Sequence, residues 1–133
     1  MAFVPDASIA AAWVLPDEEA PLADLALDRL GAETAKVPNV FWHELRNLLL
    51  TAQWRGRIDG RYADASLARL RLLPIVCPGE TDDLQVMLLA RRHRLTAYDA
   101  SYLALAIREG CALVSLDRRL RESAAAEGVA AFR

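Results

Sequence analysis

The chain has few cysteines and histidines, and their placement narrows the chemistry open to it. Cys77 and Cys111 stand far apart and form no C-x-x-C pair, so we expect small core residues rather than a disulfide or a zinc site. His43 and His93 have no partners at ligand spacing, which argues against a histidine-bound zinc. The sequence also lacks the G-x-x-x-x-G-K-[ST] and G-x-G-x-x-G motifs, so the usual nucleotide-binding loops are absent.

Long apolar runs are missing as well. The stretch from Met1 to Asp6 lacks the basic start and long apolar core of a signal peptide, and no run reaches membrane-spanning length. We therefore expect a cytoplasmic protein without a membrane segment. A composition of 54% hydrophobic and 26% charged residues is typical of a folded chain, and a length of 133 residues predicts one domain over residues 1–133.

The charge balance gives no overall indication of nucleic-acid binding, because the net charge is -2. What matters for such binding is where the charges lie rather than their sum. Lys36 is the only lysine, and the arginine bias suits bidentate phosphate contacts, although genome composition produces the same bias. Two arginine clusters, residues 91–94 and 118–121, fit either a grip on a nucleic-acid backbone or solvated helix faces.

Short apolar runs alternate with helical patterns along the chain. We expect strands at about residues 2–5, 36–37, 73–77, 111–115 and 129–132, and helices at about residues 6–13, 17–30, 38–54, 59–72, 81–93, 97–109 and 117–128. This alternation predicts an α/β fold with a small, mainly parallel sheet. The first strand is expected to end at Pro5, since proline cannot donate to a ladder.

Four acids stand where an α/β sheet gathers its ligands, at the carboxyl ends of strands. Asp6 and Asp117 follow strands, Asp99 opens a strongly apolar helix, and Glu44 lies one to two turns into a helix that follows another strand. Carboxylates that converge on one edge repel one another unless a cation neutralises them. Such oxygen ligands suit Mg²⁺ or Mn²⁺, which can activate water and hold a phosphate oxygen. The pattern predicts phosphodiester hydrolysis at a metal site.

Each acid also has a simpler interpretation. Asp6 and Asp117 fit helix N-caps, and Asp99 falls in a capping-box pattern in which it would serve only the backbone. Glu44 fits a solvated helix position. The tripeptide Asp-Ala-Ser at Asp6 and Asp99 recurs at residues 64–66, where it follows no strand and receives no role. Location, rather than the tripeptide, therefore distinguishes the candidate site residues.

Two serines accompany these acids. Ser8 lies two residues after Asp6, and Ser115 lies two residues before Asp117. Both are candidates for substrate binding, through a hydrogen bond to a phosphate or to a water held by the metal. Helix capping explains their positions equally well.

Four pieces of the chain resemble PIN-domain ribonucleases, and specifically the VapC-type toxins of toxin–antitoxin pairs. The pieces span nearly the full length and are Asp6-Ala7-Ser8 with Trp13, Glu44 with Asn47, residues 95–106, and residues 113–120 with the closing Gly128-Val129. The resemblance implies a PIN-like three-layer α/β/α fold with a small, mainly parallel central sheet.

The resemblance also implies an activity and its partners. Asp6, Glu44, Asp99 and Asp117 would form an acidic quartet that binds Mg²⁺, or Mn²⁺ as a substitute, in an endoribonuclease that cleaves RNA. A homodimer is implied, together with a cognate VapB-type antitoxin that covers the acidic groove. The alternative is a catalytically inactive PIN-like module that binds RNA or protein.

Two positions depart from the family pattern. Pro5 stands where an apolar, often β-branched residue is usual, and Ser115 stands where threonine is common. The first change bears on the length of the opening strand, and neither removes an acid of the quartet.

Overall fold

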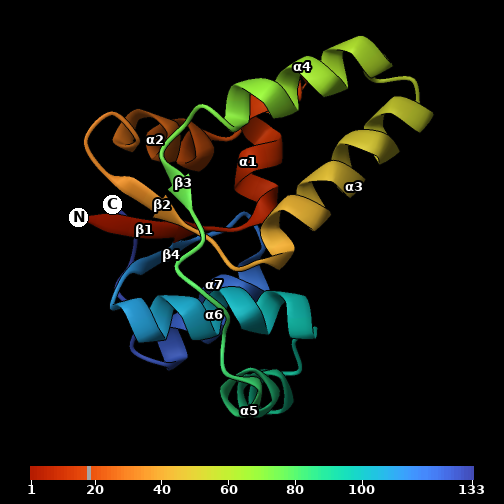
Figure 1. Cartoon of the computed structure of the whole chain (residues 1–133). Helices are drawn as coiled ribbons and strands as arrows, with labels where there is room; N and C mark the ends of the chain where they lie inside the picture. The colour runs from red at the N-terminus through yellow and green to blue at the C-terminus, as the bar shows by residue number, and fades with distance from the viewer. Residues whose placement is uncertain (18) are drawn as a thin grey trace.

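The computed structural model describes residues 1–17 and 19–133. Glu18, which we expected in the connection to the second helix, lies outside them. A four-stranded sheet of order β3-β2-β1-β4 forms the centre, and all of its neighbouring strands are parallel. Helices cover both faces of the sheet (Figure 1), so the expected three-layer α/β/α fold is confirmed.

The elements follow the predicted order. The strands are β1 (Ala2–Pro5), β2 (Thr34–Lys36), β3 (Ile75–Val76) and β4 (Ala112–Val114). The helices of the described ranges are α1 (Ala7–Val14), α2 (Pro21–Arg29), α3 (Val40–Trp54), α4 (Gly60–Leu70), α5 (Asp83–His93), α6 (Ala97–Glu109) and α7 (Arg118–Ala126). Most of the expected elements therefore form, with ends that shift by a few residues.

The first strand ends at Pro5, as expected, and the ladder explains why proline is tolerated there. The backbone N–H of Asp6 donates to the Val114 carbonyl at 3.0 Å, so the nitrogen of Pro5 points to the other neighbour, β2. Pairing with β2 has already stopped at Phe3, opposite Ala35. Pro5 therefore removes no donor that the sheet requires.

Two predicted strands are shorter than expected. The run 73–77 pairs only over β3, because it forms the edge of the sheet and has β2 as its one neighbour. The predicted strand 129–132 is wrong, since only Ala131 makes an isolated parallel bridge, to Leu113. Apolar residues at a chain end pack against the core here without forming a ladder.

The second helix begins later than predicted. Residues 17–19 were expected to supply its first turn, but α2 begins at Pro21, whose missing N–H suits the first helical position. Asp17 instead forms an ion pair with Arg57, whose Nε donates to the carboxylate at 3.1 Å. Cys77 also differs from expectation, because it is exposed rather than part of the core, while Cys111 is half-buried.

α6 lies between the sheet and α5, which accounts for its nearly continuous apolar sequence (Figure 1). Leu103 and Leu105 are fully buried. The helix begins where the Thr96 hydroxyl accepts from the backbone N–H of Asp99, at 3.1 Å. It ends at Gly110, whose φ of 65° is a left-handed value that favours glycine.

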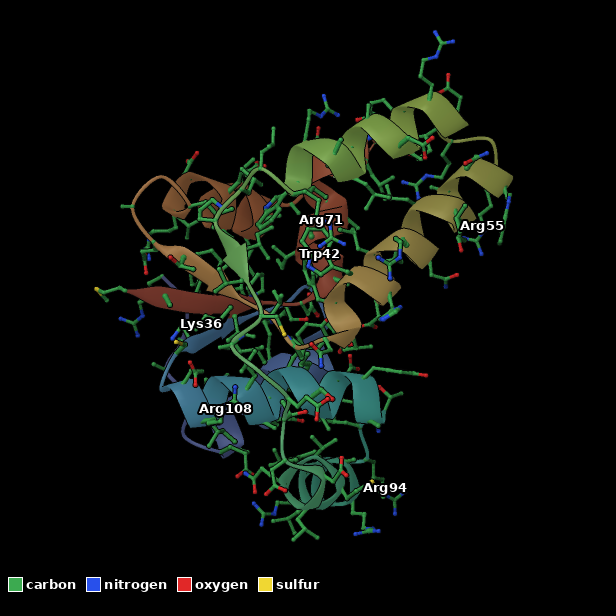
Figure 2. The ribbon with its side chains drawn as sticks, in the orientation of Figure 1. Lys36, Trp42, Arg55, Arg71, Arg94 and Arg108 are labelled. Carbon is green, nitrogen blue, oxygen red and sulfur yellow. The ribbon has the colours of Figure 1, made fainter. Side chains whose placement is uncertain are left out.

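α3 and α4 form a hairpin that extends away from the sheet (Figure 1). α3 packs against α1 as well as α4, and its C-terminal end lies away from the sheet (Figure 1). The Arg71 guanidinium stacks on the Trp42 ring, 3.7 Å from its centroid, and joins the C-terminal end of α4 to the first turn of α3 (Figure 2). The base of the hairpin is thus fixed beside the sheet edge.

Candidate active site

One hollow in the protein is lined by all four predicted acids. Its volume is about 260 Å³, and its lining residues are Asp6, Ala7, Ser8, Glu44, Asn47, Leu48, Asp99, Tyr102 and Asp117. The acids come from four places in the chain: the end of β1, the third helix, the first turn of α6, and the turn after β4. Asp64, in the repeated tripeptide, is exposed on α4 and does not belong to this lining.

Asp6 is buried, and serine hydroxyls hold both of its carboxylate oxygens. Ser8 Oγ donates to Oδ1 at 2.6 Å, and Ser115 Oγ donates to Oδ2 at 2.5 Å. Each hydroxyl in turn accepts a hydrogen bond from a backbone N–H of the turn after β4. The Leu116 N–H donates to Ser8 Oγ at 3.2 Å, and the Asp117 N–H donates to Ser115 Oγ at 2.9 Å. The serines therefore orient Asp6, and Ser115 is fully buried.

Asp6 and Asp117 line the hollow and are also helix N-caps. Asp6 accepts from the Ile9 N–H at 3.3 Å. Asp117 Oδ1 accepts from the N–H groups of Arg119 and Leu120, at 2.8 and 3.2 Å. The capping interpretation is thus correct for both residues, and it is compatible with a site role because a helix N-terminus favours the ionised carboxylate.

Glu44 is held by a residue that the sequence analysis missed. The Tyr102 hydroxyl donates to Glu44 Oε1 at 2.7 Å, and the tyrosine ring is fully buried in the apolar cluster. Burial, and then the negative charge of Glu44, raise the pKa of Tyr102 well above its ordinary range, so the phenol stays a donor. The available sequence indication was spacing, since Tyr102 follows Asp99 by three residues and shares its helix face.

The carboxylate of Asp99 is the least restrained of the four. Its backbone N–H caps onto Thr96, but within residues 1–17 and 19–133 its side chain accepts no hydrogen bond and forms no ion pair. Only the threonine half of the expected capping box is therefore present. Asp99 is half-buried and lines the hollow with a carboxylate that no hydrogen bond from the described residues holds.

The hollow concentrates negative charge without a compensating cation from the protein. Burial is the largest cause that raises the pKa values of Asp6, Glu44 and Asp99, and for Glu44 and Asp99 the neighbouring acids add to it. No Lys, Arg or His of the described ranges forms an ion pair with any of the four acids. Carboxylate oxygens in this setting are a donor set that fits Mg²⁺ or Mn²⁺.

The four carboxylates of the hollow do not form a complete metal site. Among the residues that the structure describes, no group of three or more His, Cys, Asp or Glu side chains is arranged so as to hold a metal ion. Mutual repulsion favours separated carboxylates, and Asp6 and Glu44 are restrained by their hydroxyl donors. The chemistry of the residues thus fits a hard cation, and Asp99 is the acid whose carboxylate has no partner among the described residues.

Several members of the arginine clusters have structural partners. Arg92 and His93 both contact the Glu127 carboxylate, at 2.8 and 2.5 Å, which joins α5 to the end of α7. Arg121 donates to the Ser115 carbonyl at 3.0 Å, behind the hollow. These contacts favour a structural role for the three side chains.

No helix in the described ranges has the length and apolarity needed to cross a bilayer.

Comparison with known protein families identifies the class. The family model named PIN domain matches residues 3–126, and this range contains every acid of the hollow. The chain therefore belongs to the PIN domain family, as the sequence resemblance implied.

Its relatives within the family are VapC ribonucleases, which agrees with the narrower resemblance. VapC ribonuclease Mb0985 of Mycobacterium bovis is 34% identical over 127 residues, which cover 93% of this chain and 92% of that protein. Ribonuclease VapC3 of Pyrobaculum aerophilum is 30% identical over 129 residues, covering 92% of this chain and 94% of that protein.

Solved structures show the same fold. The crystal structure of PAE2754 from Pyrobaculum aerophilum has a TM-score of 0.63 and 25% identity, and the match covers 92% of this chain and 87% of that one. VapC20 of Mycobacterium tuberculosis, described as a toxin that cleaves the sarcin–ricin loop, has a TM-score of 0.65 and 16% identity over 100% and 99% of the two chains. The second likeness supports the fold alone.

Proposed function

We propose that this chain is a Mg²⁺-dependent endoribonuclease, with Mn²⁺ as a possible substitute, that acts as the toxin of a toxin–antitoxin pair. The observation that supports it is the hollow lined by four carboxylates that no protein cation neutralises, in a chain whose relatives are VapC ribonucleases. Asp6, Glu44, Asp99 and Asp117 would hold the metal. The metal would supply a Lewis acid that acidifies water and offsets the charge on a phosphate oxygen.

The four acids differ in how the protein holds them. Asp6 is fixed in place, because two hydroxyls and a backbone N–H donate to it. Asp117 is oriented by the first turn of α7, and Glu44 by Tyr102. Asp99 is the member that no donor among the described residues restrains, and its raised pKa means that a proton competes with the cation for this carboxylate.

The decisive experiment compares two aspartates that share the Asp-Ala-Ser context. Asp99→Asn removes a proposed ligand and should lower Mg²⁺-dependent cleavage of total RNA by about 100-fold or more, because even outer-shell partners of a metal contribute roughly 10–100-fold. Asp64→Asn changes an exposed residue of α4 and should leave cleavage intact. Circular dichroism would verify that both variants are folded.

Two results would contradict the proposal. Unchanged cleavage by Asp99→Asn would show that this acid takes no part in catalysis. Wild-type protein that retains RNA but shows no EDTA-sensitive cleavage would instead support the inactive PIN-like module. Mapping of the cut sites with Mg²⁺ and with EDTA separates these outcomes and identifies the RNA substrate.

We also propose a cognate VapB-type antitoxin and a homodimeric state. The uncompensated acids of the hollow favour capture by a basic segment of such a partner. Expression of the chain alone should inhibit growth, and co-expression of a small neighbouring gene product should restore it. Harmless overexpression of an active enzyme would contradict the toxin role, and light scattering would test the dimer.

A further inference from the structure

Two helices whose backbones make few close contacts with each other supply Glu44 and Asp99 to the hollow. α3 packs mainly on α1 and α4, whereas α6 packs on α5, β1, β4 and α7 (Figure 1). In the described ranges, the hydrogen bond from Tyr102 to Glu44 is the one hydrogen bond or ion pair that joins α3 to α6. The two helices share apolar packing in the core, and this contact is the polar link between them at the hollow.

Tyr102 is well suited to fix a neighbour. Its ring is fully buried in the main apolar cluster of the core, so the hydroxyl has little freedom. The hydroxyl reaches the hollow on the helix face that also presents Asp99, one turn earlier. Glu44 has no other hydrogen-bond donor among the described residues, and only its Oε1 atom is used.

We propose that Tyr102 is a positioning residue for the metal site: its hydroxyl holds the Glu44 carboxylate beside α6, so that Glu44 and Asp99 meet the same divalent cation. One carboxylate oxygen of Glu44 is occupied by the phenol, and the other is left for the cation. This inference rests on the proposed function and adds a residue that lies outside the acidic quartet.

The test measures metal binding directly, apart from catalysis. Tyr102→Phe keeps the buried ring and removes only the hydroxyl. It should weaken Mn²⁺ binding, measured by isothermal titration calorimetry on the full chain, by about tenfold or more, as is typical for residues that orient metal ligands. Because the loss lies in affinity, a higher Mg²⁺ concentration should restore much of the RNA cleavage.

The chain offers a matched control. Tyr62 also donates its hydroxyl inside the protein, to the Val14 carbonyl, and it lies outside the lining of the hollow. Tyr62→Phe removes the same group and a comparable hydrogen bond, so it should leave Mn²⁺ affinity unchanged. A general loosening of the fold would instead affect both variants.

A double-mutant cycle shows whether Tyr102 acts through Glu44. In a Glu44→Gln background, Tyr102→Phe should add little further loss of Mn²⁺ affinity, because the carboxylate that it positions is already gone. Equal losses in both backgrounds, an unchanged affinity in Tyr102→Phe, or a Tyr102→Phe protein that no longer folds would overturn the positioning role. Wild-type protein that neither binds Mn²⁺ nor cleaves RNA would overturn the proposed function and this inference together.

Discussion

The buried hydrogen bond between Ser115 and Asp6 leads to a quantitative prediction. Ser115→Ala would leave Asp6 Oδ2 without its donor in a place where Asp6 is only 5% exposed, so water cannot replace the hydroxyl. The Asp117 N–H would also lose its acceptor, but Asp117 is exposed and this group can bind water. The expected loss therefore arises almost entirely at the carboxylate.

The magnitude follows from the charge of the acceptor. A hydrogen bond to a charged group contributes about 1.5–3 kcal/mol, and an unsatisfied buried acceptor keeps its desolvation penalty. We expect Ser115→Ala to lower the free energy of unfolding at neutral pH by about 2–3 kcal/mol. For a domain of this size that corresponds to a fall in Tm of roughly 6–15 °C.

Urea unfolding followed by circular dichroism measures the effect, and Ser66→Ala is the control. Ser66 is also fully buried, but it belongs to the repeated tripeptide on α4, where its hydroxyl accepts from Arg69 at 3.3 Å. No carboxylate depends on it, so the loss should stay within about 1 kcal/mol.

The difference between Ser115→Ala and wild type should also depend on pH. Burial raises the pKa of Asp6, and the Ser115 hydrogen bond opposes that rise, so the pKa of folded Ser115→Ala should be higher still. The penalty belongs to the ionised carboxylate. It is present in full above both folded pKa values and disappears as the pH falls through them. A penalty that is constant with pH, or equal to that of Ser66→Ala, would refute the reasoning.

Two further predictions concern metal and packing. Asp6, Glu44 and Asp99 have folded pKa values above their unfolded ones, so their ionisation destabilises the metal-free protein as pH rises through the folded values. The gain in Tm from MgCl₂ should therefore be larger at pH 8 than at pH 5. Equal gains at the two pH values in differential scanning fluorimetry would contradict this. Leu103→Ala, in the buried face of α6, should lower the free energy of unfolding by about 3–5 kcal/mol, while Leu84→Ala, at a position 81% exposed, should change it by less than about 0.5 kcal/mol in the same urea assay.

The sequence predicts best those features whose causes are local. The bounds of α6 are correct because a capping threonine precedes the helix and Gly110 follows it. The strand expected at residues 129–132 is wrong because strand formation depends on a paired neighbour, which no local pattern reveals. The late start of α2 had a local indication that the prediction overlooked, since Pro21 suits the first helical position.

The same distinction applies to the site. Asp6 and Asp117 could be placed because residues after parallel strands share one edge of a sheet. The partners of these acids could not be placed, because Tyr102 and Glu44 are 58 residues apart, and Ser115 and Asp6 are 109 apart. Such contacts depend on how α3 and β4 dock, which is a property of the assembled fold rather than of any segment.

The bond between Asp6 and Ser115 also affects when the site can form during synthesis. β1 is made first and becomes the centre of the sheet, but its neighbour β4 and the serine that holds Asp6 Oδ2 are made near the end. A growing chain therefore contains Asp6 and Ser8 long before it contains Ser115, the second serine that orients the carboxylate. Under the proposed function, a nascent chain would therefore gain nuclease activity only after nearly the whole domain has emerged and folded.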